Sequence, residues 1–167
     1  MSFSIPHRLP QLTLIAAAIY VADRLSKIWV SHHVPLGGAI PVVPRLLRIT
    51  HWMNEGAAFS LFADSASPPA VRWGLIAFTL LAVVAVTALL IRWGSRLTLT
   101  TVALALILGG ALGNLHDRLN YGSVIDFIEV HIFTYHWPDF NVADSAIVTG
   151  ACLLFLDSLL PRNKAEA

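Results

Sequence analysis

The chain has 167 residues, of which 56% are hydrophobic and only 13% are charged. This charged share is about half of what a soluble globular domain carries, so the composition argues against an ordinary soluble domain and against a disordered chain. The net charge of +1 provides no basic field, and no nucleic-acid partner is expected. The composition therefore predicts a small integral membrane protein, with residues 1–167 forming a single membrane domain.

Four apolar stretches predict the helices. In chain order, membrane-spanning helices are expected at residues 10–30, 72–92, 96–116 and 142–160, each about long enough to cross a hydrocarbon core of ~30 Å. The first stretch also contains Asp23, Arg24 and Lys27. It could instead be a cleavable secretory signal, but no small-x-small cleavage site follows its apolar core.

Basic residues near the ends of these stretches predict the orientation. Arg8, Arg92, Arg96 and the basic C-terminal tail lie close to the expected helices, which places both termini on the cytoplasmic side. The longer segments, 31–71 and 117–141, are then extracytoplasmic. They also contain arginines, so the bias in charge is small.

The first extracytoplasmic segment has the pattern of a β-strand. Apolar and polar residues alternate over residues 47–52, and Asn54, Glu55 and Gly56 predict a turn before residues 57–62. A hairpin or small sheet at the membrane surface is therefore expected. The predicted fold is a membrane all-α bundle of four transmembrane helices, with this small extracytoplasmic β-sheet or hairpin and a second extracytoplasmic loop.

Several polar residues lie where burial of a charge is costly without a partner. Asp23 and Lys27 are four residues apart in the acid-before-base order that pairs well on a helix. They form either a structural ion pair or a brace for a site on other helices. Asn114 and Arg118 have the same spacing, and the glycines before Asn114 would let a neighbouring helix approach closely.

Two carboxylates indicate a possible chemistry. Asp126 has four apolar neighbours, and Asp144 follows Asn141 by three residues at the start of the fourth stretch. Asp144 could simply complete a helix cap with Asn141. Both acids are nevertheless expected on the outer side at similar depth, and two acids in a poorly hydrated site share one proton. Such a pair can activate a water molecule and protonate a carbonyl group.

Other functions lack their sequence features. There is no His-Glu-x-x-His or Gly-x-Ser-x-Gly motif, and the single Cys152 lies within an apolar stretch. The histidines show no metal-ligand spacing and are expected at the surface, so no metal is predicted. A proton-coupled transporter would also use intramembrane acids, but it predicts inverted repeats, which the sequence lacks. A scaffold protein would have little reason to concentrate acids at one membrane depth.

Five motifs occur in order along nearly the whole chain: Asp23-x-x-Ser-Lys27, Asn54-x-Gly-Ala-Ala-Phe59, Gly-Gly-Ala-Leu-Gly-Asn114-Leu-x-Asp-Arg118, Val-Ile-Asp126-Phe and Phe-Asn141-x-Ala-Asp144-Ser. In their order and spacing the sequence resembles the lipoprotein signal peptidase (signal peptidase II) family of bacterial inner-membrane aspartyl proteases. One departure is Arg24, where the family often has an uncharged glutamine. This departure adds a charge beside Asp23.

The resemblance implies that Asp126 and Asp144 are the catalytic residues. It implies a supporting or substrate-binding role for eight further residues: Asp23, Lys27, Asn54, Gly56, Asn114, Arg118, Asn141 and Ala143. The implied substrate is a prolipoprotein with a diacylglyceryl cysteine, cleaved just before that cysteine, with membrane lipid as the other partner and no cofactor. It further implies a multi-pass protein of the inner membrane, with both termini cytoplasmic and the active site near the extracytoplasmic face. A monomer is expected.

Overall fold

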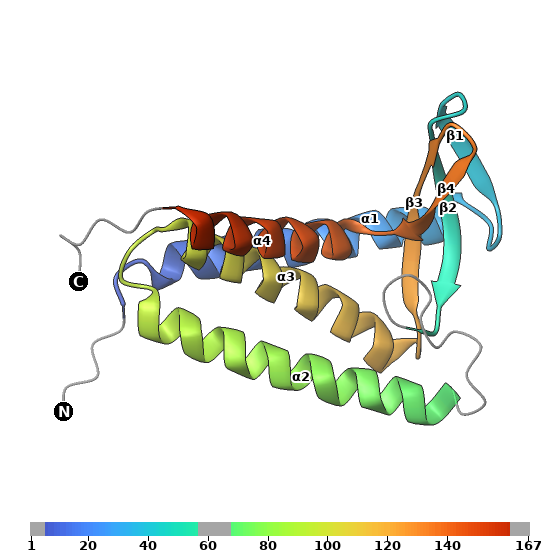
Figure 1. Ribbon diagram of the computed structural model, residues 1–167. Coiled ribbons are helices and arrows are strands. Elements are labelled where there is room, and N and C mark those ends of the chain that lie inside the picture. The colour runs from blue at the N-terminus through green and yellow to red at the C-terminus, as the bar shows by residue number, and fades with distance from the viewer. Residues whose placement is uncertain (1–5, 57–67, 161–167) are drawn as a thin grey trace.

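A computed structural model describes residues 6–56 and 68–160 of the chain. Within these ranges the elements are, in chain order, α1 (Leu9–His33), β1 (Ala39–Val43), β2 (Leu47–Asn54), α2 (Pro68–Trp93), α3 (Leu99–Asn120), β3 (Val124–Ile132), β4 (Tyr135–Phe140) and α4 (Val142–Leu159). The helices run lengthwise, and the strands lie together at one end (Figure 1). The start of α1 and the end of α4 lie at the opposite end.

Among the described residues, three helices are long and apolar enough to cross a membrane: α2, α3 and α4. Large apolar side chains on α2 face outward, such as Leu81, which is 69% exposed. α1 is 25 residues long but less apolar, because Asp23, Arg24 and Lys27 lie in its second half. α3 continues to Asn120, beyond the predicted end at residue 116, since a helix can extend past the residues that hydrocarbon covers.

The strands form one antiparallel sheet in the order β1-β2-β3-β4. β2 confirms the strand predicted over residues 47–52. The prediction of a second loop is wrong, because residues 124–140 form the β3-β4 hairpin and β3 pairs with β2. The sequence pattern did not predict β3. Nearly every position in the first half of β3 is buried, so this strand lacks an apolar-polar alternation. Residues 57–62, expected after the turn, lie outside the described residues.

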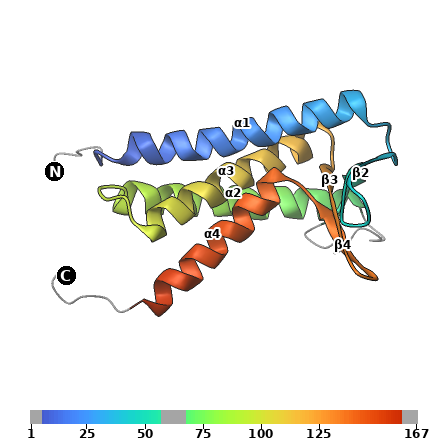
Figure 2. The same cartoon turned by 90° about the horizontal axis from the view of Figure 1, so that it is seen from above.

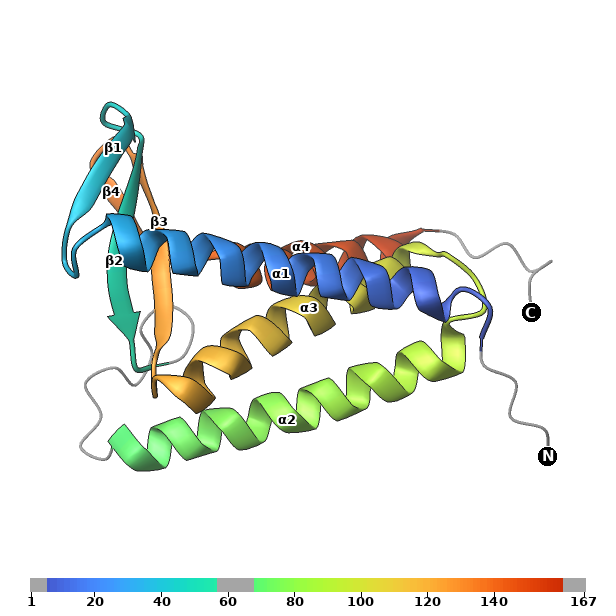
Figure 3. The same ribbon diagram turned by 180° about the vertical axis from the view of Figure 1, so that it is seen from behind.

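α3 is the central helix and packs against α1, α2 and α4. It lies between α1 and α2 in Figure 3, and α4 diverges from α1 away from the sheet in Figure 2. A Cβ atom on Gly110 would lie 2.4 Å from the Ala143 carbonyl oxygen, and one on Gly113 would lie 2.6 Å from Asp23 Oδ2. The expected close packing at these glycines is therefore confirmed.

A small apolar cluster joins the helices to the sheet. Val30 and Val34, at the end of α1, pack with Phe127 of β3, and all three are buried. Phe127 directly follows Asp126 in β3 and points to the opposite face of the strand. The cluster therefore holds β3 so that Asp126 turns toward the remaining helices.

Candidate active site

Asp126 is buried in β3 and receives hydrogen bonds from two asparagine amides. Asn54 Nδ2, at the end of β2, donates to Asp126 Oδ2 over 2.9 Å. Asn141 Nδ2, before α4, donates to Asp126 Oδ1 over 2.8 Å. Two segments distant in the sequence therefore hold the carboxyl group in place.

Asp144 lies in the first turn of α4 and forms a capping box with Asn141. Asn141 Oδ1 accepts from the Asp144 amide over 2.9 Å, and Asp144 Oδ2 accepts from the Asn141 amide over 3.3 Å. The other oxygen, Asp144 Oδ1, accepts from Asn114 Nδ2 over 2.7 Å. The helix cap predicted for Asp144 is therefore present. The Asp144 carboxyl group also lines a cavity.

Asn141 links the two acids, since it contacts both carboxyl groups. Burial, and next the nearby charge of Asp144, raise the pKa of Asp126 to about 7, against the opposing hydrogen bonds from Asn54 and Asn141. Near neutral pH, Asp126 can therefore hold a proton. A pair coupled in this way titrates as a unit, so the proton belongs to both acids.

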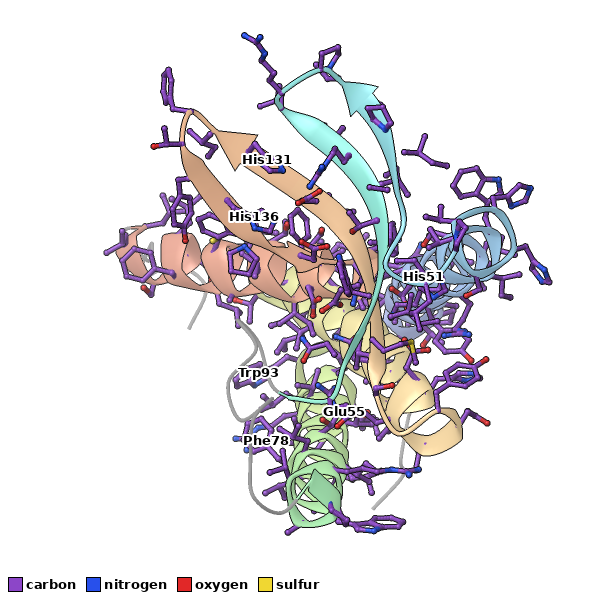
Figure 4. All side chains as sticks on the ribbon, turned by 90° about the vertical axis from the view of Figure 1, so that its right-hand side faces the viewer. His51, Glu55, Phe78, Trp93, His131 and His136 are labelled. Atoms are coloured by element: carbon purple, nitrogen blue, oxygen red, sulfur yellow. The ribbon has the colours of Figure 1, made fainter. Side chains whose placement is uncertain are left out.

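Two cavities meet at Asp126. One, of about 410 Å³, is lined by Trp52, Met53, Asn54, Glu55, Asp126, His136, Pro138 and Asp139. The other, of about 700 Å³, is mostly apolar and lies among α2, α3, α4 and the sheet, with Asp126 and Asp144 both on its wall. Figure 4 labels Phe78 of α2 from the larger cavity and Glu55, just after β2, from the smaller one. A ligand in the larger cavity can therefore contact both acids.

Lys27 fixes the orientation of the amide that reaches Asp144. Its side chain is 0% exposed, and its Nζ lies 2.9 Å from Asp23 Oδ2, 2.7 Å from Asp117 Oδ2 and 3.1 Å from Asn114 Oδ1. An ammonium group only donates, so Asn114 must turn its oxygen toward Lys27 and its NH₂ group toward Asp144. The predicted pair of Asp23 and Lys27 is present and extends into the site.

Asp23 explains why Ala143 belongs to the site. The amide N–H groups of the first turn of a helix have no partner within the helix. Asp23 Oδ1 accepts from the Ala143 amide over 3.0 Å, and both residues are fully buried. The carboxylate on α1 therefore fixes the N-terminus of α4, where Asp144 lies.

Arg24 pairs with Asp117 of α3, and Asp23 pairs with Lys27. Asp117 is fully buried between Arg24 and Lys27, and its Oδ2 also accepts from the Ile125 amide over 3.3 Å. Two acids and two bases thus balance in charge, as burial requires. Asp117 was not predicted as a site residue. Its charge beside the third apolar stretch was the available signal in the sequence, because a charge at that place needs a partner.

Arg118 and Asn114 both line the larger cavity, so the expected proximity of these side chains is present. Arg118 Nη2 donates to the Gly56 carbonyl oxygen over 3.0 Å, and the Gly56 amide donates to Asn54 Oδ1 over 2.9 Å. This chain of contacts confirms a turn at Asn54–Gly56 and fixes the amide that binds Asp126. The remaining part of that motif, residues 57–59, lies outside the described residues.

The expectation that the histidines lie at the surface is wrong for His51. His51 is buried, with Nδ1 2.8 Å from the Val34 carbonyl oxygen. His131 and His136 lie beside Glu129, with one ligand atom of each residue within 4.8 Å of the others. The two histidines are partners across the β3-β4 hairpin, a relation visible only once the hairpin is known.

The chain is similar to known proteins in both sequence and fold. Residues 15–160 match the family model described as Signal peptidase (SPase) II. A lipoprotein signal peptidase of Pseudomonas aeruginosa (strain UCBPP-PA14) is 44% identical over 165 residues, covering 96% of this chain and 94% of its own. One of Paraburkholderia phytofirmans is 46% identical over 145 residues, covering 87% and 82%.

A solved structure described as a bacterial membrane enzyme, determined by the in meso method at 2.3 Å resolution, has a TM-score of 0.83 and 28% sequence identity. The likeness covers 98% of both chains. The sequence relatives and the fold therefore lead to the same conclusion: the chain is a membrane protein and belongs to the signal peptidase II family.

Proposed function

We propose that the protein is an aspartic endopeptidase that removes the signal peptide from prolipoproteins. The substrate carries a diacylglyceryl group on its cysteine, and cleavage occurs just before that cysteine. The observation that carries this proposal is the placement of Asp126 and Asp144 on the wall of one cavity, with Asn141 in contact with both. The relatives named above are lipoprotein signal peptidases, and their family does not favour the transporter alternative.

The two acids share one proton and have different roles in the reaction. The ionised carboxylate takes a proton from water as the water oxygen attacks the scissile carbonyl carbon, and the protonated carboxyl group donates to the carbonyl oxygen. Collapse of the tetrahedral intermediate breaks the C–N bond, and the leaving nitrogen receives a proton from the pair. No covalent enzyme intermediate forms. Asn54, Asn114 and Asn141 hold the carboxyl groups in position through the hydrogen bonds described above.

The two cavities suit a lipidated substrate. Apolar side chains of α2 and α4 line the larger cavity. Burial of acyl chains and of an apolar signal peptide in this cavity is therefore favourable. The smaller cavity has exposed polar side chains on its wall and can supply water. A scissile bond between the two regions would lie at Asp126, which is common to both.

We further propose four membrane-spanning helices with both termini cytoplasmic, in the bacterial inner membrane. Arg92 and Arg96 lie at the α2–α3 link, at the same end as the start of α1 and the end of α4 (Figure 1). Basic residues at that end favour the cytoplasmic side. The sheet and the two acids are then near the extracytoplasmic face. In this arrangement α1 crosses the membrane with its charges paired on the protein side.

Cleavage by the purified protein tests the proposal. A diacylglyceryl-modified precursor and its unlipidated twin are incubated with wild type, Asp126→Asn and Asp144→Asn. Wild type should cleave the lipidated precursor at the bond before the cysteine and leave the twin intact. Each asparagine variant should lose about 1,000-fold or more in rate, since neither can share a proton between two acids.

Asp157→Asn is the matched control. Asp157 also lies on α4, accepts a hydrogen bond from Thr100 over 2.6 Å, and is roughly 20 Å along the helix from Asp144. Its substitution should leave the rate within a few-fold of wild type. Full activity in either dyad variant, with unfolding temperatures showing that it folds, would refute the aspartic mechanism. Equal cleavage of the twin would refute the lipid requirement.

A further inference from the structure

A second group of ionisable side chains lies on the β3-β4 hairpin. It consists of Glu129 and His131 on β3 and His136 on β4. The imidazole rings of the two histidines stack with centroids 4.9 Å apart and an interplanar angle of 15°. Figure 4 shows both labelled histidines side by side on this hairpin. The proposed peptide cleavage uses none of the three residues.

The contacts of Glu129 Oε1 are crowded. Arg48 Nη2 donates to this oxygen over 2.5 Å, while His136 Nε2 lies 2.8 Å and His131 Nε2 lies 3.1 Å from it. A carboxylate oxygen has two lone pairs, and the guanidinium group must occupy one of them because it only donates. The two imidazole nitrogens therefore cannot both be well-placed donors.

The Nε2 atom of His131 is buried and lies 3.1 Å from Glu129 Oε1, yet it has no hydrogen bond of good geometry within the part of the chain that the structure describes. When this nitrogen carries no proton, its lone pair faces a lone pair of the carboxylate oxygen. A cation between these two atoms would remove the repulsion between their lone pairs, because each atom would then bind the cation through its lone pair.

We propose that Glu129 Oε1, His131 Nε2 and His136 Nε2 form a binding site for a divalent transition-metal cation of the zinc class. Two imidazoles and one carboxylate are a ligand set that Zn²⁺ takes in proteins, with the fourth position left to water or another ligand. Bonds of ~2.0–2.2 Å hold tetrahedral ligand atoms about 3.3 Å apart. The three atoms lie within 4.8 Å of one another, so small side-chain rotations suffice.

The surroundings of Glu129 suit a metal ligand. The hydrogen bond from Arg48 lowers the pKa of Glu129 against the opposing effect of burial. Arg48 Nε also pairs with the second oxygen, Oε2. The Arg48 side chain is 44% exposed, so its Nη2 group can leave Oε1 to the cation while Nε keeps its contact. Metal-bound carboxylates are usually held by such a second hydrogen bond.

Asp139 adds a further negative charge next to the cluster. Its Oδ1 lies 3.3 Å from His136 Nε2, and its Oδ2 accepts from Thr50 Oγ1 over 2.5 Å. The charge of Asp139 offsets part of the repulsion between Arg48 and a bound cation. His136 and Asp139 also line the smaller cavity with Asp126, so the cation would lie on the wall of the candidate active site. The metal site itself does not depend on the proposed proteolysis.

The test is a binding titration on the full-length protein in detergent, without an affinity tag and washed with a chelator. Zn²⁺ is titrated into the protein in a calorimeter at slightly alkaline pH. Co²⁺ is titrated separately to follow the visible absorption typical of four-coordinate cobalt. One equivalent should bind. His131→Ala, His136→Ala and Glu129→Gln should each weaken binding by about 10-fold or more.

Two comparisons isolate the site. His32→Ala removes an exposed histidine on α1 and should leave the affinity unchanged. His136 is 53% exposed, so His136→Ala should keep the metal-free unfolding temperature of wild type. Folding and metal binding are thereby measured separately.

Two results would overturn the proposal. The first is no saturable binding of either metal to wild type. The second is unchanged binding in the folded His131→Ala/His136→Ala double variant, which would place the metal elsewhere.

Discussion

Asn54 donates one of the two amide hydrogen bonds to Asp126, and replacing it by alanine should change the pH dependence of cleavage. Burial, and then the charge of Asp144, raise the pKa of Asp126 to about 7, while the Asn54 and Asn141 hydrogen bonds act in the opposite direction. A donor stabilises the ionised carboxylate. Its removal therefore favours the protonated form and raises the pKa further.

The size of the effect follows from the hydrogen bond. A bond to a charged group contributes about 1.5–3 kcal/mol, and water entering from the cavity would replace part of it. A net loss of about 1.4 kcal/mol corresponds to about one pKa unit. In a dyad that must keep one proton, activity falls at high pH when the second carboxyl group ionises. The alkaline limb of the rate profile should therefore move upward by about one unit in Asn54→Ala.

The assay is kcat/KM for a lipidated precursor across the pH range, with wild type, Asn54→Ala and Asn120→Ala. Asn120 is an exposed amide that donates to the His116 carbonyl oxygen over 2.7 Å at the end of α3, so its variant should reproduce the wild-type profile. An alkaline limb in Asn54→Ala that stays in place, or that moves to lower pH, would refute this account of the proton on Asp126. A lower rate alone would not support it.

Two further predictions concern packing and capping. Gly110→Ala should lower stability by about 1–3 kcal/mol, because the new methyl group would clash with the Ala143 carbonyl oxygen. Gly74→Ala on α2 is the control: its new methyl group would have nothing within 4 Å, so the substitution should be neutral or stabilising. Thermal unfolding in detergent compares the two variants. Equal unfolding temperatures would contradict the packing argument. Asn141→Ser should keep the helix cap while losing the amide donor to Asp126 and about 10-fold or more in kcat. An unchanged kcat would show that the donor is dispensable.

Local features of the sequence were enough to identify much of the fold. Apolar stretches of membrane-spanning length predicted the helices, because length and apolarity are properties of consecutive residues. The strand at residues 47–52 followed from its alternation, and the cap at Asn141 and Asp144 from their spacing. The first half of β3 is almost entirely buried and has no such alternation, so the pairing of β3 with β2 could not be predicted from the pattern alone.

The site required contacts between distant residues. Arg24 and Asp117 are 93 positions apart, and their pairing depends on how α1 packs against α3. The same holds for Lys27 and Asn114, which together orient the amide on Asp144, and for the cluster on the β3-β4 hairpin, where strand pairing brings His136 to His131.

The sequence by itself determined which chemical groups the protein has and which segments suit a membrane, since composition and periodicity are written in consecutive residues. Only the tertiary structure decided which groups meet. Buried charges and amides take their orientation from partners on other elements, and those partners are set by helix packing and strand register.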